Sequence, residues 1–79
     1  MSIYEYITQA YSEEPGEEGA LARDMLRLSK EHKELKEIRT FGDFVCISEL
    51  VGLSTEGFRA ITDSLYCEAC TACGLPIIA

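Results

Sequence analysis

The chain has 79 residues, which is enough for one small domain with a single hydrophobic core. Seven Lys and Arg residues are outnumbered by fourteen Asp and Glu, giving a formal net charge of -7, and 47% of the residues are hydrophobic. The hydrophobic content excludes a disordered chain, and the acidic balance disfavours direct binding of nucleic acid, because phosphates are bound mainly by basic groups.

The sequence predicts neither a membrane-spanning stretch nor a leader. No segment approaches the roughly 20 consecutive apolar residues that cross a bilayer, and the residues from Met1 to Glu5 lack the basic start and apolar middle of a signal peptide. We therefore expect a cytoplasmic protein without membrane contact. In a reducing compartment, its four cysteines would be thiols or metal ligands rather than disulfides.

The first helix is predicted to begin at Ser2, because Ser2 and Glu5 have the S-x-x-E spacing of a capping box. Helical spacing gives it an inner face of Ile3, Tyr4, Ile7, Ala10 and Tyr11. Residues 12–19 contain proline, two glycines and four glutamates, which is typical of a loop. A second helix follows, and its predicted inner face consists of Ala20, Leu21, Ala22, Met25, Leu26 and Leu28.

The later part of the chain predicts two or three further helices. Residues 30–37 alternate lysine and glutamate in a pattern that supports a helix only weakly, so we expect a frayed helix end or a mobile connector with a solvated His32. Thr40 is predicted to cap a third helix, closed by Gly52 in the left-handed conformation. Its inner face should consist of Phe44, Ile47, Leu50 and Val51. Ser54 should open a last helix that ends at Gly74, with the inner face Phe58, Ile61, Leu65, Ala69 and Ala72.

These elements predict an all-α fold, a compact bundle of four short helices, or five if the connector is counted. The bundle would form one domain over residues 1–79, in which residues 74–79 are an apolar C-terminal tail. No period-two alternation argues for a strand.

Two segments resemble a known family. Residues 2–7, with the sequence SIYEYI, and residues 43–53, with the sequence DFVCISELVGL, resemble the YozE-like family of small bacterial proteins, and order and spacing agree over roughly residues 2 to 65. The resemblance implies a sterile-alpha-motif-like helical bundle. It carries no settled activity, so it supplies no catalytic residue and no cofactor.

The cysteines are the residues most able to carry chemistry. Cys67, Cys70 and Cys73 are spaced by three, a fragment of zinc and iron–sulfur sites, and Cys46 would have to supply the fourth ligand. On a continuous helix, however, three such thiols spread over an arc of roughly 120° instead of converging. We therefore expect no bound metal or cofactor, with a metal site and a redox pair as the alternatives to packed thiols.

No pattern in the sequence indicates catalysis. His32 is the only histidine, and it has no predicted nucleophile beside it. We expect a non-enzymatic protein–protein interaction module or regulator that binds a protein, and a basic protein would suit its charge. The alternative is a phage-type acidic inhibitor, such as an anti-CRISPR protein or nucleic-acid mimic, that blocks a nucleic-acid-binding host protein. The oligomeric state stays open. The candidate contact residues are Glu13, Glu14, Glu17, Glu18, Leu75, Ile77 and Ile78.

Overall fold

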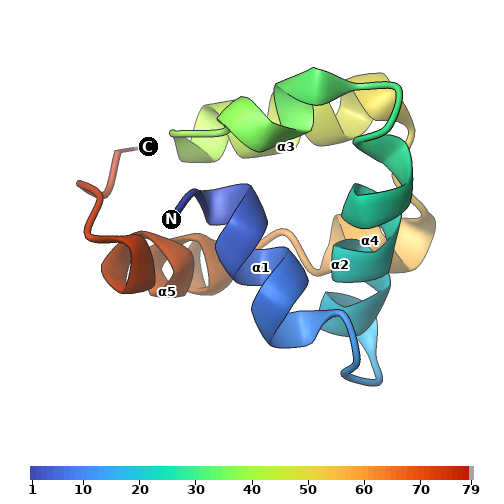
Figure 1. Cartoon of the computed structure of the whole chain (residues 1–79), viewed down its shortest axis with the longest axis horizontal. Coiled ribbons are helices and arrows are strands. Elements are labelled where there is room, and N and C mark those ends of the chain that lie inside the picture. The colour runs from blue at the N-terminus through green and yellow to red at the C-terminus, as the bar shows by residue number, and fades with distance from the viewer. Residues whose placement is uncertain (79) are drawn as a thin grey trace.

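The structure is a computed structural model that describes residues 1–78. Five α-helices and one 3-10 helix make up this part of the chain, and it contains no strand (Figure 1). The predicted all-α bundle is therefore confirmed. The elements are α1 (Ile3–Tyr11), α2 (Glu17–Leu28), η1 (Lys33–Glu37), α3 (Phe41–Val51), α4 (Thr55–Arg59) and α5 (Asp63–Cys73). Across residues 1–78, no helix has both the length and the apolar character needed to cross a membrane.

The predicted helix starts at Ser2 and Thr40 are confirmed. The Ser2 hydroxyl accepts a hydrogen bond from the Glu5 amide at 3.1 Å, and the Glu5 carboxylate accepts one from the Ser2 amide at 3.4 Å. Thr40 and Asp43 form the same reciprocal pair at the start of α3. Gly52 ends α3 with a φ of 72°, a left-handed conformation that favours glycine because it has no Cβ.

The prediction of one long helix after Ser54 is wrong. The chain forms α4, turns, and starts α5 at Thr62, whose hydroxyl accepts a hydrogen bond from the Leu65 amide at 3.1 Å. This second cap interrupts the helical register, so residues on either side of it do not share one face. Phe58, predicted to be buried, is 41% exposed, and Ala72 is exposed as well.

Three further residues predicted to be inner, Ala10, Leu26 and Leu50, are exposed. The buried residues of α3 are Phe44, Ser48 and Val51. At about 100° per residue, Leu50 points away from this face, and it is 75% exposed.

In α1 and α3, two hydroxyl residues occupy core positions that the apolar spacing did not predict. Ser48 donates to the Phe44 carbonyl at 2.6 Å, and Thr8 donates to the Tyr4 carbonyl at 2.8 Å. A hydroxyl that is satisfied in this way can be buried at little cost.

Within the connector at residues 30–37, Lys33–Glu37 form the 3-10 helix η1, which packs on α1 and α3, so this part of the connector is a separate helix and not a frayed end of α2. Its charges are exposed, but Leu35 and the following Ile38 are buried in the core. Burial of these two side chains anchors a segment whose charge pairs alone support a helix weakly. His32 is half-buried and lies 3.8 Å from the Glu34 carboxylate.

The helices meet closely at small residues. α4 packs on α2 with Gly57 near the Leu21 backbone, where a Cβ would lie 3.4 Å from the Leu21 Cα. At the same junction, the Asp24 carboxylate accepts a hydrogen bond from the Ser54 amide at 3.0 Å. The core enclosed between the helices consists of Ile3, Tyr4, Ile7, Leu21, Ala22, Met25, Leu35, Ile38, Phe44, Val51, Ala60, Leu65, Tyr66, Ala69 and Cys70.

Candidate partner-binding surface

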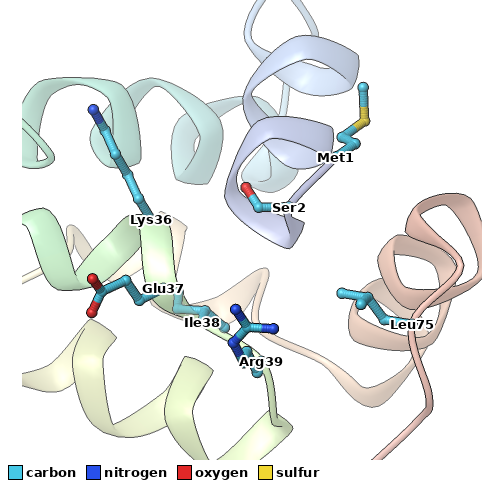
Figure 2. A pocket seen from close by; sticks show the side chains of 7 residues that line it. All are labelled: Met1, Ser2, Lys36, Glu37, Ile38, Arg39 and Leu75. Carbon is cyan, nitrogen blue, oxygen red and sulfur yellow. The ribbon is translucent and has the colours of Figure 1, made fainter.

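Both ends of the described chain lie on the same side of the molecule, beside α5 and the segment that joins η1 to α3 (Figure 1). A cavity of about 160 Å³ opens between them. Figure 2 shows the side chains that line it, which come from the N-terminal residues, the end of η1 and the chain after α5. The lining residues are Met1, Ser2, Lys36, Glu37, Ile38, Arg39 and Leu75.

The tail beyond α5 is held through one side chain, that of Tyr66. The Tyr66 hydroxyl donates to the Arg39 carbonyl at 3.0 Å and accepts from the Ile78 amide at 3.1 Å. The Ile78 carbonyl in turn accepts from the Phe41 amide at 3.1 Å. Because both backbone polar groups of Ile78 are bonded, the tail lies across the start of α3.

The turn that leads into the tail is a helix-ending glycine motif. Gly74 has a φ of 69°, and the Leu75 amide donates to the Cys70 carbonyl at 2.9 Å. The predicted end of the helix at Gly74 is therefore confirmed. This turn brings Leu75 back over the cavity, where its side chain is partly buried.

The tail leaves apolar side chains in solvent. Ile77 is 59% exposed and Ile78 is 49% exposed, and Met1, which lines the adjacent cavity, is 63% exposed. We call the surface formed by Met1, Leu75, Ile77 and Ile78 the tail surface. Neighbouring exposed apolar groups on a fixed backbone are typical of interaction sites.

The acidic residues predicted to bind a partner lie elsewhere. Glu13, Glu14, Glu17 and Glu18 are all exposed, at the turn between α1 and α2 and in the first turn of α2, and Figure 1 places this region, which we call the acidic turn, far from the tail. The predicted contact residues therefore form two separate surfaces.

The backbone of this acidic turn is fixed by Arg23. The Arg23 guanidinium donates to the Ser12 carbonyl at 3.2 Å and to the Glu14 carbonyl at 3.0 Å. Glu17 and Glu18 lie in the first turn of α2, where their charges suit the positive end of the helix dipole. Across residues 1–78, the ion pairs are Arg27 with Asp24 and His32 with Glu34, so the four glutamates of the turn are not neutralised internally.

The four cysteines differ in their exposure to solvent. Cys46 is exposed on α3, whereas Cys70 is buried in the core and Cys67 and Cys73 are partly exposed on α5. Within residues 1–78, no three Cys, His, Asp or Glu side chains are placed to hold a metal ion together.

Cys73 has a structural partner at the N-terminal end of α1. Its thiol donates to the Ser2 carbonyl at 3.3 Å. Burial raises the pKa of the Cys73 thiol, which keeps it protonated as a donor.

One cluster that the sequence analysis missed links α1 to α5. The hydroxyls of Tyr6 and Tyr11 both donate to the same oxygen of Glu68, Tyr6 at 2.8 Å, and the two rings pack edge to face with centroids 6.4 Å apart. The hydrogen bonds from Tyr11 and Tyr6 lower the pKa of Glu68, and the bond to Glu68 raises the pKa of Tyr11 to about 12. No local pattern signals this cluster, because Glu68 lies 62 residues from Tyr6 in the chain.

Comparison with known proteins gives no match to any family model, curated protein or solved structure. The resemblance to the YozE-like family therefore stays a prediction.

Proposed function

We propose that this chain is a non-enzymatic protein–protein interaction module whose partner binds on the tail surface. The observation that carries the proposal is the exposure of Ile77 and Ile78, at 59% and 49%, on a backbone that is held in place by Tyr66 and Phe41. A fixed backbone presents these side chains without a large loss of conformational entropy on binding.

Binding is a better use of this surface than catalysis. The cavity of about 160 Å³ is smaller than the roughly 300–1,000 Å³ of common ligand and cofactor pockets. It has room for one side chain of a partner, which matches the way that a protein interface inserts an anchor residue into a pocket.

The same proposal includes a cytoplasmic location and a relationship to the YozE-like family. All four cysteines are free thiols, which suits a reducing compartment and hence the cytoplasm. The all-helical fold agrees with the bundle that the YozE-like resemblance implies.

A second function is favoured by the acidic turn. Glu13, Glu14, Glu17 and Glu18 are exposed and unpaired within residues 1–78, so they offer a concentrated negative charge to a basic partner. This is what an acidic inhibitor that occupies a nucleic-acid-binding groove would require. Such binding would weaken steeply with salt and would compete with nucleic acid.

Quantitative capture of interacting proteins with matched variants tests the proposal. Ile77→Ser with Ile78→Ser removes apolar side chains but keeps the backbone bonds of the tail. Leu50→Ser is the control, because Leu50 is 75% exposed on α3 and belongs to neither surface. A partner that binds through the tail surface should be recovered at least tenfold less with the double variant and unchanged with the control.

The acidic-inhibitor alternative is tested in the same assay. Replacing all four glutamates of the turn by glutamine keeps their size and removes their charge. Loss of the partner in this variant, together with competition by DNA and retention in the tail variant, would replace the first function by the second. A partner that is retained by both variants would reject both surfaces.

A further inference from the structure

Arg39 lines the cavity beside the tail, and its backbone is hydrogen-bonded on both sides. The Arg39 amide donates to the Asp43 carboxylate at 3.4 Å, and its carbonyl accepts from the Tyr66 hydroxyl at 3.0 Å. Figure 2 shows the Arg39 guanidinium between Ile38 and Leu75. The Arg39 side chain itself is exposed, so its guanidinium is accessible to a ligand that enters the cavity from solvent.

The positive charge of Arg39 is not neutralised by its neighbours. Within residues 1–78, its guanidinium makes no hydrogen bond and no ion pair. The Glu37 carboxylate points away from it in Figure 2. The Lys36 ammonium is engaged elsewhere, 5.9 Å from the centre of the Tyr4 ring.

Besides Arg39, the cavity is lined by three apolar residues and by Ser2, Lys36 and Glu37. Met1, Ile38 and Leu75 supply its apolar lining. The volume of about 160 Å³ is close to that of an engineered apolar cavity of about 150 Å³ that binds benzene. The space therefore accepts one ring or one branched aliphatic group.

We propose that this cavity binds a carboxylate carried on an apolar group of about the size of benzene. The carboxylate pairs with the Arg39 guanidinium, whose planar fork matches the two carboxylate oxygens, and the apolar group packs on Ile38 and Leu75. A small aromatic acid and the C-terminal phenylalanine of a peptide share this chemistry. The inference rests on the proposed function, because Met1 and Leu75 belong to both the cavity and the tail surface.

Titration of the labelled protein with phenylacetate, followed by amide chemical shifts, tests the inference. Mass spectrometry should first show that the protein used retains Met1, because Met1 lines the cavity. We expect saturable shifts at Ser2, Arg39 and Leu75. The neutral analogue 2-phenylethanol should bind at least tenfold more weakly at the same ionic strength.

Two variants separate the cavity from general charge attraction. Arg39→Gln should weaken phenylacetate binding at least tenfold, whereas Arg59→Gln, an exposed arginine at the end of α4, should leave it unchanged. Circular dichroism verifies that both variants are folded. Equal binding of phenylacetate and 2-phenylethanol, or unchanged binding by Arg39→Gln, would overturn the inference.

A third pair of ligands identifies the source of the carboxylate. A peptide C-terminus is indicated if N-acetylphenylalanine binds tenfold tighter than phenylacetate and if N-acetylphenylalanine amide, which lacks the carboxylate, does not bind. A free acid is indicated if phenylacetate binds as tightly as N-acetylphenylalanine or more tightly. Either result supports the inference. If the tail variant loses its protein partner but the wild-type protein does not bind phenylacetate, the proposed function stands and only the cavity ligand is rejected.

Discussion

Replacing Gly19 with alanine is expected to destabilise the protein, although alanine normally stabilises a helix. Gly19 lies in the first turn of α2, against the turn that leaves α1. A Cβ at this position would overlap the Glu14 carbonyl oxygen, lie 2.7 Å from the Glu14 carbonyl carbon and lie 3.0 Å from the Arg23 guanidinium. Contacts under 3.0 Å to a Cβ are essentially never seen, so the turn would have to move.

The size of the effect follows from what the turn would lose. The Glu14 amide donates to the Tyr11 carbonyl at 2.9 Å, and the Glu14 carbonyl accepts from Arg23 at 3.0 Å. Two such hydrogen bonds contribute about 0.5–1.5 kcal/mol each, and overpacking adds about 1–3 kcal/mol. The helix preference of alanine returns up to about 1 kcal/mol. We therefore expect a net loss of about 1–5 kcal/mol in the free energy of unfolding, with a midpoint of about 3 kcal/mol.

Gly42→Ala is the matched control, because it makes the same chemical change in the first turn of α3. A Cβ at Gly42 would come no closer than 3.8 Å to a neighbour, the Thr40 hydroxyl oxygen, so this variant should gain up to about 1 kcal/mol. Thermal denaturation followed by circular dichroism should show Gly19→Ala melting about 10–20 °C lower than the wild type. Equal or higher melting of Gly19→Ala would refute the close approach of α2 to the turn.

Three further predictions concern the core, the tyrosine cluster and the thiols. Phe44→Ala should lower the free energy of unfolding by about 3–5 kcal/mol in chemical denaturation, because Phe44 is fully buried. Phe58→Ala should lower it by only about 1–2 kcal/mol, because Phe58 is 41% exposed. Equal losses would contradict the finding that Phe44 lies in the core and Phe58 does not. The lowered pKa of Glu68 stabilises the fold above its usual value of 4.5, and this contribution is lost as the pH falls through the lowered pKa. The raised pKa of Tyr11 stabilises the fold below its usual value of 10.0, and this contribution is lost as the pH rises toward about 12. Glu68→Gln should flatten the acid side of a stability profile measured over pH, and an unchanged profile would argue against the cluster. Protein purified under reducing conditions should contain no stoichiometric zinc or iron in elemental analysis; about one metal per chain that is lost in Cys70→Ser would contradict this.

The sequence by itself determined where three of the five described α-helices begin and where two of them end. The caps at Ser2, Thr40 and Ser54, the left-handed end at Gly52 and the helix end at Gly74 all occur as predicted. Each depends on hydrogen bonds between residues a few positions apart or on a backbone conformation that glycine permits. Such interactions are local, so the identities of a few neighbouring residues are enough to predict them.

Which apolar residues are buried was decided by the tertiary structure. Helical spacing predicts that side chains share a face, but not which neighbouring helix covers that face. Leu50 and Phe58 satisfied the spacing and are exposed, whereas Thr8 and Ser48 did not count as apolar and are buried. The break at Thr62 had an equally local signal, but it competed with a continuous apolar pattern that favoured one long helix.

The candidate surface shows the same division. The apolar tail with Ile77 and Ile78 was evident from the sequence, but its position depends on Tyr66 bonding to Arg39, 27 residues away in the chain. The cavity with its unpaired guanidinium exists only once these segments are packed together. Contacts between distant residues leave no periodic or spaced pattern in a single sequence, and for that reason only the folded chain could reveal the site.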